Sequence, residues 1–197
     1  MQLRPVGPHA LLAEVGDARS ALALALWART AGLGAVEVVP AAATVLFDGV
    51  DDPDRLRGSL AGWSGEAPEV SRDPVQVPVT YDGDDLAFVA ELWGTDVAGV
   101  VARHTATGFV SSFCGFAPGF AYLTGLDEAW AVPRLDTPRP RVPAGAVALA
   151  GPWCGVYPTA SPGGWRVIGR TDLALWDASR PDPALLAPGT PVRFVPA

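Results

Sequence analysis

The second half of the chain consists of short apolar runs separated by turns rich in glycine and proline, and this pattern restricts the fold more than any other feature. Strand-like runs are expected at residues 109–113, 147–150, 165–169, 173–176 and 192–195. No long amphipathic helix interrupts them, so the pattern predicts an all-β barrel or sandwich. Two short helices precede the runs, at residues 86–93 and 96–104, with Asp84 and Thr95 as their expected N-terminal caps.

The first half has a mixed pattern of helices and strands. Strand-like runs are expected at residues 10–15, 36–39, 44–47 and 75–81. One helix follows Asp17 and extends to about residue 31, and a second follows Asp51 or Asp52. The resulting order β-α-β-β-α-β is typical of a ferredoxin-like domain. We therefore expect an α+β fold, with this small domain over residues 1–82 and the barrel domain, which carries the site, over residues 83–197.

The composition indicates a globular protein and excludes several kinds of site. Hydrophobic residues make up 49% of the 197 residues, no apolar run is long enough to cross a bilayer, and the start lacks the layout of a signal peptide. We therefore expect a cytoplasmic protein without a membrane partner. Every basic residue is Arg, which excludes a Walker A loop and lysine Schiff-base chemistry. The net charge of −7 argues against nucleic-acid binding, and two His with two Cys give no metal-site spacing.

The charges are unevenly distributed along the chain. Residues 1–103 hold fifteen of the 21 acidic residues. Residues 129–171 hold one acid, Asp136, and five arginines, which gives this segment a net charge of +4; the arginines are Arg134, Arg139, Arg141, Arg166 and Arg170. Such a segment could attract an anionic ligand or an acidic partner, or it could consist of solvated loop arginines. Charge alone favours neither interpretation.

Three blocks combine glycine, proline, aromatic residues and arginine, at residues 115–123, 133–145 and 157–171. Glycines allow a ligand to approach the main chain closely, and prolines hold turns rigid. Aromatic rings supply flat apolar walls, and arginines recognise anions through two parallel hydrogen bonds. The blocks therefore predict a preformed cleft for a small, partly anionic molecule. The alternative, that glycine and proline serve only tight barrel corners, does not account for the arginines as readily.

Together these blocks resemble the family of the B-type subunit of 5-oxoprolinase, whose members are also known as sporulation-kinase inhibitors and as subunit 1 of allophanate hydrolase. The resemblance extends over nearly the whole chain. It implies a small α+β domain followed by a cyclophilin-like β-barrel. It also implies the ATP-dependent opening of 5-oxo-L-proline to L-glutamate, shared with an A-type and a homologous C-type subunit, in which Mg²⁺ arrives with ATP. A single chain would then be inactive.

The resemblance and the chemistry of the turns give a set of candidate site residues. The candidate catalytic residues are His104, Arg141 and Tyr157, and the candidates for binding substrate or phosphate are Arg134, Arg170, Gly119, Phe120, Ser161, Gly163 and Gly164. The arginines would hold a phosphate or carboxylate at a cleft shared with the C-type subunit. His104 ends a predicted helix, so it is either a general acid or base or a cation that interacts with the helix dipole.

Three further residues leave alternatives open. Ser161 lacks the Gly-x-Ser-x-Gly surroundings of a hydrolase nucleophile, so a turn residue or hydrogen-bond donor is the favoured interpretation. The Tyr157 hydroxyl could contact a ligand or only pack. Family members usually carry Gln-Thr where this chain has Trp153-Cys154, and an indole at that turn would change the shape of a pocket there.

The resemblance also leaves other functions open. The chain could be an inhibitor that binds a sensor histidine kinase without catalysis, or a subunit that processes allophanate or urea. A prolyl isomerase would rest only on the analogy between barrels, and analogy of fold is weak evidence for chemistry.

Overall fold

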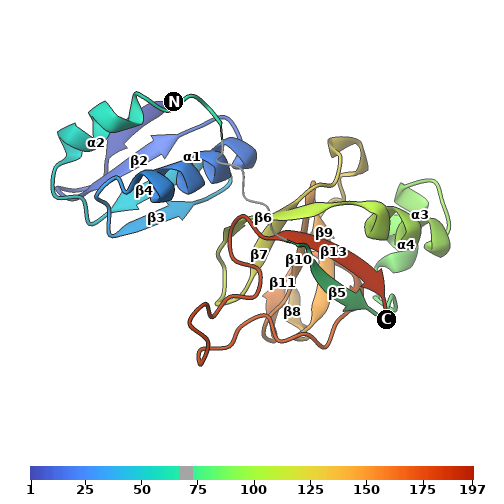
Figure 1. The fold of residues 1–197 in the computed structure, drawn as a ribbon. Coiled ribbons are helices and arrows are strands. Elements are labelled where there is room, and N and C mark those ends of the chain that lie inside the picture. The colour runs from blue at the N-terminus through green and yellow to red at the C-terminus, as the bar shows by residue number, and fades with distance from the viewer. Residues whose placement is uncertain (67–72) are drawn as a thin grey trace. The chain divides into compact units, whose positions relative to one another are not determined.

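The computed structural model describes residues 1–66 and 73–197 and divides into two compact units, residues 1–71 and 72–197. The first unit contains β1 (Gln2–Pro5), β2 (Ala10–Glu14), α1 (Ala18–Ala31), β3 (Glu37–Pro40), β4 (Thr44–Asp48) and α2 (Pro53–Leu60) (Figure 1). Its sheet has the antiparallel order β1-β2-β4-β3. Both helices share one core cluster with the strand residues Leu11 and Phe47, so they pack on the same face of the sheet.

The helix ends of the first unit follow local sequence signals. The Asp17 side chain accepts a hydrogen bond from the Ser20 N–H at 2.7 Å, and α1 ends at Gly32, whose φ of 61° lies in the left-handed region. The Asp52 side chain caps α2 by accepting from the Arg55 N–H at 2.9 Å. These predictions are confirmed because a cap depends on only a few neighbouring residues.

The ferredoxin-like arrangement is not confirmed. Its last expected strand, β5 (Val75–Val79), pairs in parallel with β13 (Pro191–Pro196) in the second unit, whereas the first unit gains β1 instead. The expected boundary after residue 82 therefore differs from the observed division after residue 71. Val77 and Val79 alternate toward a buried face, as expected, but alternation does not specify which sheet buries them.

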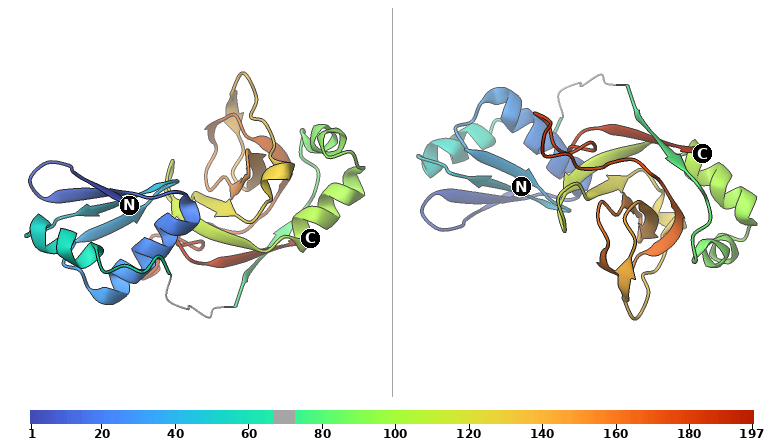
Figure 2. Two further views of the ribbon diagram at one scale, coloured as in Figure 1. Left: turned by 90° about the horizontal axis from the view of Figure 1, so that it is seen from above. Right: turned by 90° about the horizontal axis from the view of Figure 1, so that it is seen from below.

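The second unit contains two α-helices and a nearly closed β-barrel. Besides β5 and β13, its elements are α3 (Leu86–Leu92), α4 (Val97–Ala106), β6 (Phe109–Cys114), β7 (Ala121–Thr124), the 3₁₀-helix η1 (Glu128–Trp130), β8 (Arg139–Val142), β9 (Ala146–Ala150), β10 (Trp153–Val156), β11 (Ser161–Gly163) and β12 (Arg166–Arg170). The helices α3 and α4 lie together at one side of the barrel (Figure 2). This mixed α+β chain with a barrel agrees with the predicted fold class.

The barrel sheet has seven strands in the order β12-β9-β10-β7-β6-β13-β5. Its two edges meet where Thr80 and Arg170 exchange backbone hydrogen bonds of 2.9 Å in each direction. A second, two-stranded sheet joins β8 and β11. Closure satisfies edge groups that would otherwise be exposed, which explains why a chain with so many short strands forms a stable unit.

Most of the expected elements of this unit are confirmed, with local differences. The expected runs at 109–113, 147–150, 165–169 and 192–195 correspond to β6, β9, β12 and β13. The run at 173–176 forms no strand, and Trp176 makes only an isolated bridge. The N-cap positions of α3 and α4 are Asp85 and Asp96 rather than Asp84 and Thr95.

Strand β9 separates two packed clusters. Val147 and Leu149 face the main core of the barrel, whereas the alternate residues Ala146, Ala148 and Ala150 belong to a second cluster rich in aromatic rings. Alternation along a strand sends successive side chains to opposite faces. The small alanines leave room for large rings on the second face, and this is where the candidate site lies.

Candidate functional site

The second face of the sheet carries a cluster of aromatic rings centred on Phe120. Its ring centroid lies 5.3 Å from those of Tyr157 and Trp165 and 5.1 Å from that of Tyr122, in edge-to-face contacts. Gly155 lies beneath these rings, and a Cβ there would come within 3.0 Å of Phe120 and Trp165. The glycine is therefore needed for the rings to approach the strand this closely.

These rings form the walls of an open pocket of about 390 Å³. The lining residues are Phe116, Phe120, Tyr122, Arg134, Pro138, Tyr157, Pro162, Gly163, Gly164 and Trp165. Five of the predicted site residues are thus brought together, namely Phe120, Arg134, Tyr157, Gly163 and Gly164. Arg134 is the charged residue of this lining, and it is exposed. The pocket therefore combines apolar walls with one positive charge, as expected for a small anionic ligand.

The Tyr157 hydroxyl is the second polar group of the pocket. Burial raises the pKa of Tyr157, while the backbone N–H of Trp165 and the charge of Arg134 oppose this shift. The hydroxyl therefore stays protonated and keeps a proton to donate. A Cβ at Gly163 would overlap this hydroxyl, whereas one at Gly164 would lie at an ordinary 3.5 Å from the Arg134 guanidinium.

Phe116 lies at the edge of the pocket with an unusual backbone. Its φ is 70°, and its side chain is 61% exposed. Its ring centroid lies 5.3 Å from that of Phe120. A left-handed conformation costs a bulky residue about 1–3 kcal/mol, so the turn holds this ring at the pocket against a local preference. Gly119, in the same turn, faces Trp176 and does not line the pocket.

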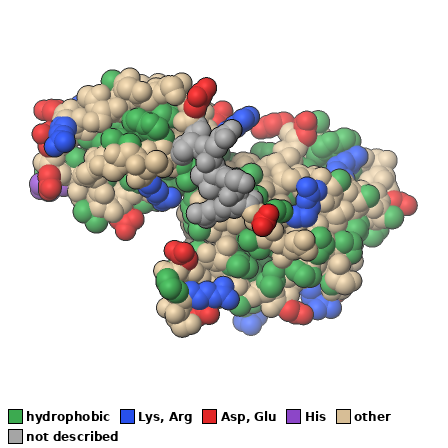
Figure 3. Space-filling view, viewed as in Figure 1, with side chains coloured by type: hydrophobic (Ala, Val, Ile, Leu, Met, Phe, Trp, Pro, Cys, Tyr) green, Lys and Arg blue, Asp and Glu red, His purple; other side chains and the backbone are tan. Residues whose placement is uncertain are grey.

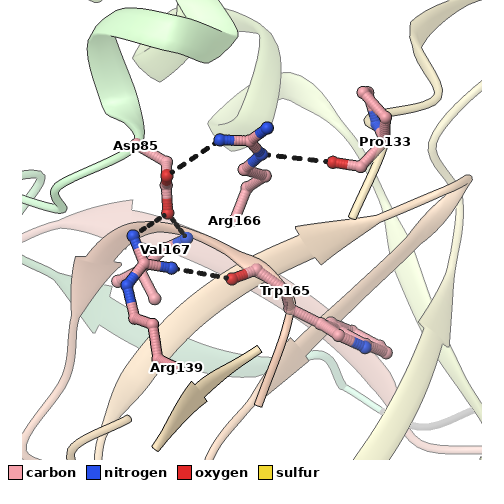
Figure 4. Close-up of polar contacts among 6 residues, drawn as sticks. All are labelled: Asp85, Pro133, Arg139, Trp165, Arg166 and Val167. Atoms are coloured by element: carbon pink, nitrogen blue, oxygen red, sulfur yellow. Dashed lines mark hydrogen bonds and ion pairs between the residues drawn. The ribbon is translucent and has the colours of Figure 1, made fainter. Parts of the chain in front are cut away.

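A buried carboxylate, that of Asp85, does not line the pocket and was not predicted as functional. Asp85 accepts hydrogen bonds from Arg139 Nη2 at 2.9 Å, from Arg166 Nη1 at 3.3 Å and from the Val167 N–H at 2.7 Å (Figure 4). Asp85 is 5% exposed. No sequence signal indicates this role, because an aspartate at the start of a helix is ordinarily interpreted as a cap.

The other two candidate arginines line a different hollow of about 240 Å³. Arg141 is exposed there, and Arg170 forms an ion pair with Asp82, with Nε 2.9 Å from Oδ2. The arginines of the second unit are also scattered across the face seen in Figure 3 rather than gathered in one patch. The structure therefore places Arg134 in the aromatic pocket and Arg141 with Arg170 elsewhere, instead of bringing all three into one cleft.

His104 lies in the core and does not line the pocket. It has no exposed surface, and its ring packs 4.3 Å from the Phe194 centroid. Its Nδ1 lies 2.7 Å from the Tyr81 hydroxyl and its Nε2 lies 3.4 Å from Cys154 Sγ. Burial lowers the pKa of His104 to about 3. The contacts fit a neutral imidazole that accepts from Tyr81 and donates to Cys154, so the geometry favours a structural role.

Ser161 and Trp153 both lie near the pocket without lining it. Ser161 is on β11, and its Oγ is buried with no hydrogen-bond partner among the described residues. Trp153 packs edge-to-face on Tyr122, with ring centroids 6.0 Å apart. Because Tyr122 lines the pocket and Trp153 does not, the indole affects the shape of the pocket only through its contact with Tyr122.

The described parts of the chain, residues 1–66 and 73–197, contain no group of three or more His, Cys, Asp or Glu side chains placed to hold a metal ion. Within the same residues, none of the helices has both the length and the apolar character needed to cross a membrane.

The sequence matches known proteins over most of its length. Residues 1–186 match the family described as carboxyltransferase domain, subdomain C and D. The B subunit of 5-oxoprolinase from Escherichia coli O157:H7 is 48% identical over 142 residues, covering 70% of this chain and 65% of that protein. The protein of the same name from Bacillus subtilis (strain 168) is 44% identical over 130 residues, covering 64% and 54%. The chain thus spans less than two thirds of the length of these curated relatives.

Solved structures of similar proteins have the same fold. The crystal structure of TTHA0988 superimposes with a TM-score of 0.80 at 37% identity, covering 96% of this chain and 40% of that chain. The structure of PH0987 from Pyrococcus horikoshii has a TM-score of 0.60 at 33% identity, covering 100% and 97%. The urea carboxylase of Kluyveromyces lactis has a TM-score of 0.67 at 18% identity, covering 99% of this chain and 21% of that chain. At this identity the similarity shows a shared fold alone.

Proposed function

Because the chain belongs to the carboxyltransferase-domain family with subdomains C and D, whose members include proteins named as the B subunit of 5-oxoprolinase, we propose that it is the B-type subunit of an ATP-dependent 5-oxoprolinase. In this proposal it acts with the A-type and C-type subunits and is inactive alone. The complex opens 5-oxo-L-proline to L-glutamate as ATP is hydrolysed. The observation that carries the proposal is the presence of Arg134 and the Tyr157 hydroxyl in one pocket walled by aromatic rings.

The pocket suits the chemistry of 5-oxoproline. That molecule is a small, nearly flat five-membered lactam with one carboxylate. The rings of Phe120 and Trp165 offer apolar walls for its methylene groups, and Arg134 offers charge-assisted hydrogen bonds to its carboxylate. The protonated hydroxyl of Tyr157 is available to donate to the lactam oxygen. Binding would thus orient both polar ends of the ligand through two separate contacts.

Ring opening requires activation of the lactam, because amide resonance makes its carbonyl carbon a poor electrophile. Phosphoryl transfer from ATP to the lactam oxygen would make that oxygen a leaving group. Water then attacks the former carbonyl carbon, and the C–N bond breaks as the ring nitrogen takes up a proton, which leaves an acyl phosphate of glutamate. A second water hydrolyses this acyl phosphate, so that glutamate and phosphate are released. Positioning and charge neutralisation dominate such a transfer. We propose that a partner protein of the complex mainly holds ATP with its Mg²⁺, while Arg141 and Arg170 of this chain contact phosphate at their own hollow.

The proposal is tested by reconstituting the complex with the A-type and C-type subunits and measuring 5-oxoproline-dependent ATP hydrolysis. Arg134→Ala should raise the KM for 5-oxoproline about tenfold to hundredfold, because one charge-assisted contact is worth roughly 1.5–3 kcal/mol. Tyr157→Phe should lower kcat by about tenfold if the hydrogen bond from its hydroxyl orients the lactam oxygen for phosphoryl transfer. Arg180→Ala is the matched control, since Arg180 is exposed and pairs with nearby Asp177. A wild-type complex without 5-oxoproline-dependent hydrolysis would refute the proposal.

The phosphate contact has a separate test. Arg141→Ala should lower kcat by about tenfold without raising the KM for 5-oxoproline, because Arg141 lies outside the aromatic pocket. Full activity of this variant removes Arg141 from the mechanism. Inhibition of a sensor histidine kinase by the lone chain, or turnover of urea derivatives by the complex, would favour the alternative functions instead.

A further inference from the structure

Asp85 stands at the N-cap position of α3 but does not cap the helix. Its side chain makes no capping hydrogen bond, unlike those of Asp17, Asp52 and Asp96 at the starts of α1, α2 and α4. Both of its oxygens are used elsewhere, Oδ2 by Arg139 and the Val167 N–H and Oδ1 by Arg166. The buried carboxylate of Asp85 therefore makes no helix-capping hydrogen bond, and its hydrogen bonds connect the start of α3 to β8 and β12.

Each of these arginines also reaches a segment that forms the pocket wall. Arg166 Nε donates to the Pro133 carbonyl at 3.3 Å, directly before Arg134. Arg139 Nη1 donates to the Trp165 carbonyl at 3.4 Å, and the ring of Trp165 lines the pocket. Figure 4 shows the two guanidinium groups on either side of Asp85, each directed toward one of these carbonyls. The carboxylate is therefore connected through the two arginines to the residue before Arg134 and to the pocket wall at Trp165.

We propose that Asp85 is a positioning residue that sets Arg134 and Trp165 in the geometry needed to bind the carboxylate-bearing ligand. This inference rests on the proposed function for the identity of the ligand. The Arg139 and Arg166 side chains are only 25% and 18% exposed, so removal of the Asp85 charge leaves two poorly solvated cations without their counter-ion. They would then separate and release the two carbonyls. Asp85 itself does not line the pocket, so its effect must pass through the residues that do.

A double-mutant cycle tests this route. In the reconstituted complex, Asp85→Asn should raise the KM for 5-oxoproline about tenfold and leave kcat within about twofold. In an Arg134→Ala background, Asp85→Asn should raise the KM by clearly less than in the wild type, because the part of its effect that passes through Arg134 is already lost and only the part that passes through Trp165 remains. Equal effects of Asp85→Asn in both backgrounds would mean a general structural role and would overturn the inference.

Hydrogen exchange needs no ligand, so it can test the positioning role of Asp85 independently of the proposed function. The Leu135 N–H, next to Arg134, donates to the Gly164 carbonyl at 2.8 Å. Asp85→Asn should speed hydrogen exchange at this amide by about tenfold or more, since the segment loses its anchor at Pro133. The matched control is Glu14→Gln, which breaks the Arg4–Glu14 pair of 2.9 Å in the first unit and should change neither exchange at Leu135 nor KM.

The outcomes are distinct. Faster exchange at Leu135 in a complex that shows no 5-oxoproline-dependent hydrolysis would support the positioning role and refute the proposed function. Unchanged exchange together with an unchanged KM would overturn the positioning role alone. If Asp85→Asn does not fold, Arg166→Gln takes its place, because it cuts the link to Pro133 and leaves the bonds of Asp85 to Arg139 and Val167. The same tenfold rise in KM is then expected, and its absence would count against the inference.

Discussion

Two of the buried polar clusters in the described residues of the barrel unit differ in charge and in what they connect. His104, Tyr81 and Cys154 form a neutral cluster inside the main core, beside Phe109 and Phe194. Asp85, Arg139 and Arg166 form a charged cluster whose arginines continue to the walls of the pocket. The hydrogen bonds of the first cluster satisfy polar atoms within the core. Those of the second cluster connect to residues that form the wall of an accessible pocket.

The contrast indicates that the face of the sheet, more than the residue type, decides whether a polar group lies in the core or beside the pocket. On β10, Cys154 faces His104 and the main core, whereas the adjacent Gly155 lies under the aromatic rings of the pocket. Successive residues of one strand thus serve opposite purposes. Histidine is the commonest general acid or base in enzymes, yet His104 is fully buried on the core face of the sheet.

Removal of the His104 side chain should produce the largest effect on stability. His104→Ala leaves a cavity in the core and removes the partner of the Tyr81 hydroxyl, so it should lower the free energy of unfolding by about 3 kcal/mol. Urea denaturation measures this loss. His9→Ala is the matched control, because His9 is exposed and the change should cost less than about 0.5 kcal/mol. Turnover per folded complex should stay normal, and a loss of activity beyond tenfold would reopen a catalytic role for His104.

Substitutions at two neighbouring glycines, Gly163 and Gly164, test the geometry of the pocket, and their expected effect on stability is smaller. Gly163→Ala should displace Tyr157, because a Cβ there would overlap its hydroxyl, and overpacking of this kind costs roughly 1–3 kcal/mol. Gly164→Ala should be tolerated, since its Cβ would meet the Arg134 guanidinium at 3.5 Å. Denaturation curves and the KM for 5-oxoproline of both variants provide the measurement. Equal behaviour of the two variants would contradict this geometry.

Sequence patterns predicted the elements of the fold better than their pairing. The caps Asp17 and Asp52 are confirmed because the relevant hydrogen bonds span three residues. Strand β5 pairs outside the unit in which it was expected, because its partner, β13, lies more than a hundred residues away in the sequence. The Thr80–Arg170 bridge that closes the barrel is non-local in the same way. Local signals determine where a strand begins, but the sheet that accepts it depends on packing elsewhere.

The same limit applies to the candidate site. Arg134, Tyr157 and Gly163 come from the motif blocks and line one pocket, because rigid turns and aromatic rings can be recognised in the sequence. Asp85 was missed because, in the sequence, an aspartate that will be buried in an ion-pair cluster looks the same as one that caps a helix. Only the contacts with Arg139 and Arg166, which are distant in the sequence, distinguish the two cases. Arg141 and Arg134 were expected together because both lie in one block, but they line separate hollows.

The neutral cluster should also give a distinctive dependence of stability on pH. The pKa of His104 is about 3 in the folded chain, against 6.5 for an ordinary histidine, because burial disfavours the charged imidazole. Between these values the unfolded chain binds a proton that the folded chain does not. The stabilisation is therefore complete above pH 6.5 and is lost as the pH falls toward 3, by about 1.4 kcal/mol for each pH unit.

A comparison of the wild type with His104→Gln isolates this effect, because glutamine is similar in size and does not titrate. The free energy of unfolding of the wild type should fall more steeply than that of the variant between pH 6.5 and pH 4, and the two curves should run parallel above pH 7. The hydrogen bond from Ser20 lowers the pKa of Asp17, and this carboxylate loses its stabilisation in both proteins below its ordinary value of 3.8. The difference between the curves above pH 4 therefore belongs to His104, and parallel curves throughout would show that its imidazole accepts a proton without leaving the core.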